Sequence, residues 1–192
     1  MRLLLAGIGI SLLGLIAGIL FSFFRIQSGS GIDDVFQKNG LWRFAPKMDL
    51  AANEYQRALI ARVGLFALRE SEVLYYALTQ DEEGNPLSSD HIYELTGESF
   101  DARYWSFTLY GGDDFLIPNQ ENRFALNEVN MEFEDSLKTN YRFHLSKEAY
   151  GKNWIPSGDA QEMSLLLRLY NPSPDIYEHA GEIALPQIKK IK

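Results

Sequence analysis

The chain has 192 residues, the size of a single domain. Hydrophobic residues make up 46% of it, which excludes intrinsic disorder and collagen-like repeats, and the lack of cysteine excludes disulfide frameworks, thiolate zinc sites and cysteine nucleophiles. The 18 basic and 26 acidic residues give a formal net charge of −8, which disfavours nucleic-acid binding because phosphates attract the opposite sign.

Residues 3–24 form an apolar segment without a charged side chain. As a helix this segment is about 33 Å long, enough to cross the hydrocarbon core of a membrane. A cleaved signal peptide is the alternative, but its apolar region is usually about 7–15 residues long and ends in small residues. The segment is longer than that and ends in Phe23 and Phe24. We therefore predict a membrane anchor over residues 1–25 that is not cleaved.

The charges beside this segment predict its orientation. Arg2 and the terminal amine precede it, whereas Arg25 follows it and residues 26–37 then contain no basic side chain. The positive-inside rule places the N-terminus in the cytoplasm and the rest of the chain outside, in the periplasm or the extracellular space. Gly14 and Gly18 have the spacing of a helix-dimer motif, although glycine is also simply common in membrane helices.

Residues 26–31 have the composition of a flexible linker, and we expect one domain over residues 32–192. Asp49 can cap a helix over residues 50–66, which we expect to pack on a sheet. The apolar residues of that helix recur at helical spacing; they are Tyr55, Leu59, Val63 and Phe66.

The chain after residue 70 changes to short strand-like runs separated by turns. The expected strands are residues 72–79, 91–95, 105–110, 131–133, 141–145 and 163–170. Alternation in two of them predicts a buried face made of Trp105, Phe107, Leu109, Leu165, Leu167 and Leu169. The fold class is therefore mainly β: an antiparallel β-sandwich, of the jelly-roll kind, with one appended helix.

Standard catalytic motifs are missing from the sequence. The three histidines, at positions 91, 144 and 179, have no metal-ligand spacing, and we predict no metal, no cofactor and no catalytic residue. His144 shares a strand face with Arg142, which predicts that it is exposed to solvent. The adjacent Asp113 and Asp114 are typical of a turn.

Three segments carry candidate binding residues. Asn119, Asn122 and Arg123 lie in an expected loop and could bind a carboxylate or sugar hydroxyls, or instead bond the loop backbone and a carboxylate such as Asp114. Trp154 could stack on a ligand or close the end of the sandwich.

The third segment contains Arg168 and Tyr170, on the strand face opposite Leu167. Because the strand is so apolar, Arg168 needs a carboxylate or a ligand as its partner. We predict that Asn119, Arg123, Trp154 and Arg168 line one polar cleft.

These segments resemble the DUF1214 family. The resemblance rests on YWSFTLYGGDDFLIPNQENRFAL (104–126), NWIP (153–156) and LLLRLYNPSPDIY (165–177), and extends over about residues 36–190. It implies a β-sandwich or jelly-roll domain, often paired with a second domain called DUF1254. No such partner is recognised in these 192 residues, where the apolar segment stands in front, and the usual closing Gly-x-Trp is replaced by Gly181-Glu182-Ile183. The family implies no catalytic residues.

Two functions remain open from the sequence. The first is a membrane-anchored, non-catalytic domain that binds a small molecule, a glycan or an envelope protein. The alternative is a hydrolase-like enzyme that acts on an anionic or hydroxyl-rich substrate. The lack of a nucleophile and base in motif spacing favours the first function.

Overall fold

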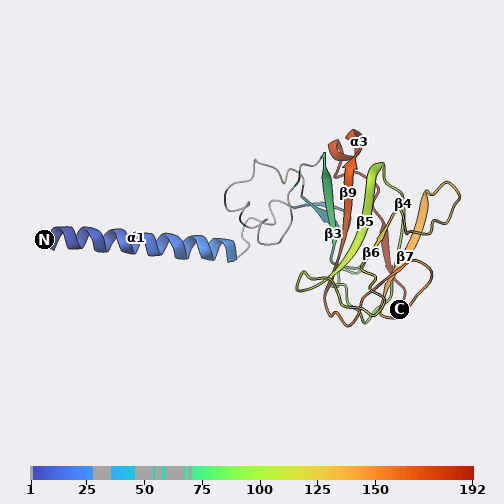
Figure 1. Ribbon diagram of the computed structural model, residues 1–192, viewed down its shortest axis with the longest axis horizontal. Helices are drawn as coiled ribbons and strands as arrows, with labels where there is room; N and C mark the ends of the chain where they lie inside the picture. Colours follow the sequence, from blue (N-terminus) through green and yellow to red (C-terminus); the bar gives the residue numbers. More distant parts are fainter. Residues whose placement is uncertain (1, 28–35, 46–53, 55–57, 59–67, 69–70) are drawn as a thin grey trace.

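The computed structural model describes residues 2–27, 36–45, 54, 58, 68 and 71–192. It contains a long N-terminal helix, α1 (Arg2–Gln27), and a β-rich domain that includes a short helix, α3 (Pro174–Glu178), before its final strand (Figure 1). Most of the expected linker and of the expected helix over residues 50–66, with Tyr55, Leu59, Val63 and Phe66, lies outside the described residues.

Helix α1 does not contribute to the core of the domain. Its stretch Leu4–Ile26 has a mean hydropathy of 2.5, and none of it is buried. By length and composition it can cross a membrane, and an N-terminal signal sequence has the same properties.

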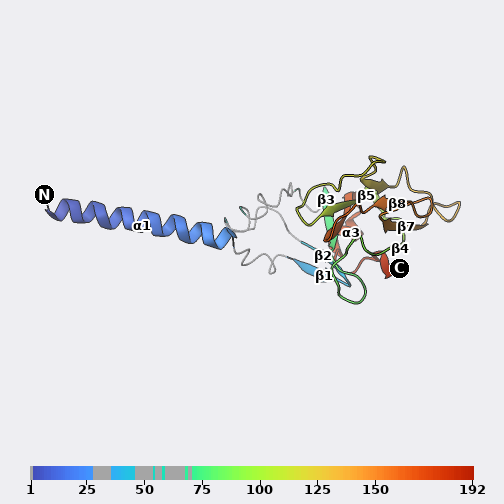
Figure 2. The same cartoon turned by 90° about the horizontal axis from the view of Figure 1, so that it is seen from below.

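One sheet of the domain has six strands in the order β1-β2-β3-β9-β5-β6. Their bounds are β1 (Gln37–Asn39), β2 (Trp42–Phe44), β3 (Val73–Leu78), β5 (Ala102–Gly111), β6 (Ala125–Asn127) and β9 (Met163–Pro172). All neighbouring pairs are antiparallel. Figure 2 shows β1 and β2 beside β3, at one edge of this sheet. The two ten-residue strands, β5 and β9, are adjacent at its centre.

The second sheet has four strands in the order β10-β4-β7-β8. Their bounds are β4 (Tyr93–Glu98), β7 (Asn140–Ser146), β8 (Trp154–Pro156) and β10 (Gln187–Lys190). Strands β7 and β8 are parallel, so the expectation of a wholly antiparallel fold is wrong for this pair. The chain turns back after Ser146 and returns to the level of His144 at Trp154.

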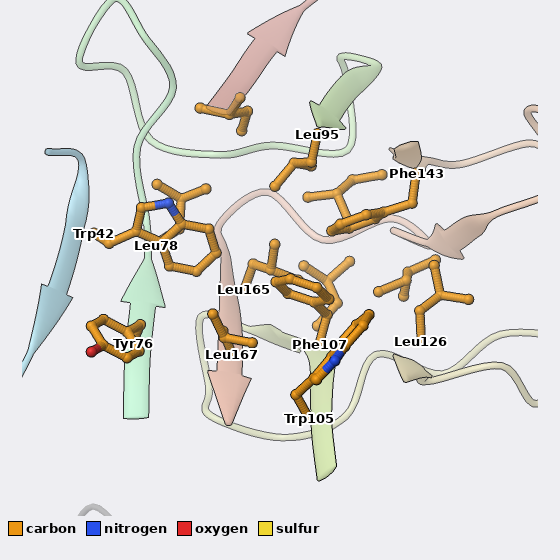
Figure 3. Packing of buried hydrophobic residues seen from close by; sticks show 14 of the residues in the cluster. Trp42, Tyr76, Leu78, Leu95, Trp105, Phe107, Leu126, Phe143, Leu165 and Leu167 are labelled. Atoms are coloured by element: carbon orange, nitrogen blue, oxygen red, sulfur yellow. The ribbon is translucent and has the colours of Figure 1, made fainter. Parts of the chain in front are cut away.

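The core lies between the two sheets. Phe107 of β5 stacks at 4.8 Å from Phe143 of β7, and Trp105 lies 5.3 Å from Tyr141, measured between ring centroids. Figure 3 shows Leu95 and Phe143 of the four-stranded sheet facing Leu165, Leu167 and Phe107. The six residues predicted to be buried are all at most 1% exposed, which confirms the face assignment from alternation.

Several strand predictions needed correction. Residues 131–133 do not form a strand, because only Phe133 pairs, through an isolated bridge to Tyr141. The short elements were not predicted, since three to five residues are too few to show a period; they are strands β1, β2, β6, β8 and β10 and helix α3. The turn predicted after β3 is present: the Asp81 carboxylate accepts hydrogen bonds from the backbone N–H groups of Glu83 and Asn85.

Candidate functional site

The outer face of the six-stranded sheet is polar and aromatic at its centre. Because side chains alternate along a strand, the residues of β3, β9 and β5 that do not enter the core point to this side. We call the central group the tyrosine–arginine face; its members are Tyr75, Tyr104, Ser106, Thr108, Tyr110, Arg168 and Tyr170. Register brings them together: Arg168 lies opposite Tyr75 on one side and Ser106 on the other.

Arg168 lies partly buried at the middle of this face. Its guanidinium donates to the Thr108 hydroxyl at 3.1 Å and to the Tyr110 hydroxyl at 2.7 Å, and it lies 5.6 Å from the centre of the Tyr110 ring. Both partners are neutral, and none of the described carboxylates forms an ion pair with Arg168. The positive charge of Arg168 is therefore held in place without being neutralised within the described part of the chain.

Tyrosine rings flank this arginine. Tyr104 and Tyr170 are cross-strand partners with ring centroids 5.5 Å apart. Burial raises the pKa of Tyr75, an effect that the nearby Arg168 opposes. Burial also raises the pKa of Tyr104, with smaller contributions from Tyr170 and Glu128. These phenols are therefore protonated at neutral pH and can both donate and accept hydrogen bonds.

The predicted loop site around Asn119 is organised by its own backbone. The Asn119 amide donates to the carbonyls of Ile117 and Arg123, both at 3.1 Å, and accepts the Arg123 N–H at 3.0 Å. All three contacts close the loop, as the structural interpretation of Asn119 expects. Asn122 is exposed, has a positive φ of 51°, and donates its N–H to the Asn119 carbonyl.

Arg123 and Trp154 contact each other. The Arg123 guanidinium lies 5.9 Å from the centre of the Trp154 ring and donates long hydrogen bonds to the carbonyls of Lys152 (3.5 Å) and Trp154 (3.4 Å). The alternative partner considered from the sequence, the carboxylate of Asp114, is wrong, since Arg123 uses main-chain carbonyls. Trp154 is 8% exposed and lies outside the main hydrophobic cluster.

The six predicted site residues thus fall into two groups. Asn119, Asn122, Arg123 and Trp154 belong to the loop before β6 and to β8, while Arg168 and Tyr170 belong to the tyrosine–arginine face. Among the described residues, no hydrogen bond, ion pair or ring contact joins the two groups. The predicted site residues therefore form two separate groups and not the single cleft that was expected.

Two hollows lie at the end of β5, and the first borders Ile117 and Pro118, just before Asn119. One, of about 570 Å³, is lined by Gly112, Asp113, Leu116, Asp159 and Glu162 among others. The second, of about 290 Å³, shares Gly111, Gly112 and Glu162 with the first. None of the six predicted residues lines either hollow.

The outer face of the four-stranded sheet contradicts the prediction for His144, which is buried at 8% exposure. Its Nε2 lies 3.4 Å from the Glu94 carboxylate, and the Tyr150 ring covers it at 4.6 Å between centroids. Alternation placed His144 on the correct side with Arg142, but it could not show that the loop after β7 folds back over that side. No group of three metal-ligating side chains occurs among the described residues.

The comparisons with known proteins agree with this fold. The model of DUF1214, described as a protein family of unknown function, matches residues 72–174, more than half of the chain. The chain belongs to the DUF1214 family. The matched region contains all six predicted site residues and both sheets except for β1, β2 and β10.

The solved structures that are similar to this chain include the following two. The crystal structure of the VPA0106 protein from Vibrio parahaemolyticus is 25% identical with a TM-score of 0.60, and the match covers 74% of this chain and 36% of that one. An uncharacterized protein from Burkholderia cenocepacia is 16% identical with a TM-score of 0.47, covering 90% of this chain and 40% of that one. The chain thus spans well under half the length of either protein, and no curated protein matches it.

Sequence reasoning identified Arg168 and Tyr170 but missed their partners. Tyr104, Thr108 and Tyr110 share one face of β5 by simple alternation, and that signal was available. What the sequence could not supply was the register that places Ser106 opposite Arg168, across 62 positions of the chain. Tyr75 was missed because residues 72–79 show no alternation of polar and apolar side chains that would mark an outer face.

Proposed function

We propose that this DUF1214 domain is a membrane-anchored binding module, without catalytic activity, whose ligand contacts the tyrosine–arginine face. One observation carries the proposal. Arg168 is partly buried, yet its described partners are the neutral hydroxyls of Thr108 and Tyr110. Removing a guanidinium from water is costly unless an anion compensates it. A ligand with a negative charge provides that compensation, and an arginine already fixed by two hydrogen bonds loses little freedom when the ligand binds.

The contacts around this arginine favour binding over catalysis. A hydrolytic site needs a nucleophile and a base within hydrogen-bond distance of each other. Within the described part of the chain, neither Arg168 nor Arg123 contacts a carboxylate or an imidazole. Both arginines bind only oxygen atoms of hydroxyls or carbonyls, which position them but do not transfer protons efficiently at neutral pH.

A glycan array tests the binding function. Full-length protein in detergent micelles is applied to an array that carries neutral, carboxylated and sulfated glycans, as wild type and as Arg168→Gln. We expect wild-type binding to at least one anionic glycan, and loss of that binding in Arg168→Gln. Arg142→Gln is the matched control, because it removes the same charge from the outer face of the other sheet. The proposal fails if no binding depends on Arg168, or if both variants lose it equally.

The anchor is part of the same proposal. The length and hydropathy of Leu4–Ile26 support a helix that stays in the membrane, with the domain outside the cytoplasm, and the spacing of Gly14 and Gly18 supports a helix dimer. Protease added to intact spheroplasts should then degrade the domain while a cytoplasmic marker survives. A protected domain, or a mature N-terminus beyond residue 20, would contradict this topology.

A further inference from the structure

The tyrosine–arginine face also restricts the charge of its ligand. This step rests on the proposed function. A guanidinium offers five N–H donors in a plane, and the described contacts of Arg168 engage one nitrogen with Thr108 and another with Tyr110. The remaining donors suit a planar carboxylate. The next arginine on this side of the sheet is Arg43, opposite Ala77 and two strands away from β9, so Arg168 is the only described cation at the centre of the face. One cation matches a singly charged group better than a phosphate, which carries up to two charges.

The phenols beside Arg168 can bind hydroxyl groups of a ligand. The hydroxyls of Tyr104 and Tyr170 have no hydrogen-bond partner among the described residues, although their rings contact each other. Both side chains are only partly buried, so part of each ring remains accessible to a ligand. A phenol hydroxyl binds alcohol hydroxyls by donating to one and accepting from another.

The tyrosine–arginine face does not favour a ligand that carries an amine as well as a carboxylate. An ammonium group requires a carboxylate or several carbonyl oxygens, and the backbone carbonyls here are engaged in the β-ladders on both sides of β9. Glu128 lies close enough to Tyr104 to affect its pKa, but it forms no described ion pair with Arg168 and follows β6, away from the centre. Amino acids and peptide termini therefore fit less well than an acid whose other groups are hydroxyls.

We infer that the ligand is a sugar acid, a uronic-acid unit of a glycan, with its carboxylate on Arg168 and its hydroxyls on Tyr104 and Tyr170. The apolar C–H side of the sugar ring lies against the tyrosine rings, which supply contact area at little entropic cost. The carboxylate supplies the negative charge that balances Arg168, and the phenol hydroxyls discriminate a polyhydroxylated acid from a simple one.

Calorimetric titration of the full-length protein in detergent micelles tests this inference. The probes are methyl β-D-glucuronide, methyl β-D-glucoside, methyl β-D-glucoside 6-sulfate and acetate. We expect the glucuronide to bind at least tenfold more tightly than each of the other three. Arg168→Gln should weaken glucuronide binding at least tenfold, and Tyr104→Phe and Tyr170→Phe should each weaken it severalfold. Arg142→Gln should leave it unchanged, and melting curves must show that every variant is folded.

The possible failures separate the two proposals. If acetate or the 6-sulfate binds as well as the glucuronide and this binding requires Arg168, the sugar-acid assignment is wrong while the binding function stands. If the glucoside binds equally well, the carboxylate is irrelevant and the assignment is again wrong. If neither the calorimetric probes nor the glycan array show binding that depends on Arg168, the binding function and the sugar-acid assignment are both wrong.

Discussion

The outer faces of the two sheets hold an arginine in opposite ways. On the four-stranded sheet, Arg142 forms ion pairs at 2.8 Å with both Glu94 and Glu134. On the six-stranded sheet, Arg168 is held by two neutral hydroxyls and one ring face. The first charge is neutralised inside the domain and stabilises the fold. Among the described residues, no carboxylate neutralises the second charge. An arginine in a strand is therefore a guide to function only once the charge of its partners is known.

The largest effect is expected from the core that both faces share. Leu167 is fully buried on the inner side of β9, so Leu167→Asp places an unpaired charge in an apolar layer and costs about 3–5 kcal/mol or more. We expect no soluble, folded protein, measured by expression and circular dichroism. Leu166→Asp is the matched control, because Leu166 lies on the outer face beside Arg168. A folded Leu167→Asp together with an unfolded Leu166→Asp would reverse the face assignment.

A smaller effect separates the two arginines. Arg142→Met leaves Glu94 and Glu134 without their cation, and because Arg142 is 45% exposed at its side chain, water screening limits the loss to about 1 kcal/mol. Arg168→Met removes two hydrogen bonds to hydroxyls but also a partly buried charge without an anionic partner among the described residues; because these effects offset each other, we expect a loss of about 0.5 kcal/mol or less. Urea denaturation of both variants measures the difference. Equal losses in the free energy of unfolding would mean that Arg168 contributes as much to stability as Arg142 does.

The smallest effect is a difference in acid sensitivity. Hydrogen bonding to Arg142 lowers the pKa of Glu94 below its ordinary value of 4.5. The unfolded chain then takes up this proton before the folded one does, so the stability that Glu94 contributes is complete above about pH 4.5 and is lost as the pH falls through the lower folded pKa. Glu94→Gln should flatten the fall in melting temperature between pH 5 and pH 3. Arg168→Gln should follow the wild-type profile, and a flattened profile there would reveal a hidden carboxylate partner.

Local pattern predicted the layers of the fold better than its connections. Alternation assigned Trp105, Phe107 and Leu167 to the core because facing in or out depends only on the strand itself. The parallel pairing of β8 with β7 depends on a loop that folds back, and nothing in Trp154–Pro156 signals it. The same loop buries His144, which is why its predicted exposure was wrong.

In the candidate site, too, local pattern predicted single residues, whereas their tertiary partners could not be predicted. Arg168 was identified because a charge within an apolar run conflicts with its surroundings, which a single strand reveals. Its partners Thr108 and Tyr110 come from a strand about 60 positions earlier, and only tertiary pairing sets that register. Asn119 was correctly considered as a loop-forming residue, because amides that bond nearby backbone act over a few residues.

The position of β9 has a consequence for how the protein is made. This strand lies between β3 and β5, yet it is synthesised some 50 residues after β5 ends. Until it emerges from the ribosome, β3 and β5 have no common neighbour, and Trp105 and Phe107 lack the leucines of β9 that lie beside them in the sheet. A nascent chain therefore carries two unjoined halves of a sheet with their apolar sides uncovered, and this is the stage at which it is most prone to aggregate. Synthesis of β9 supplies the shared neighbour of β3 and β5 and, in the same strand, the arginine of the outer face.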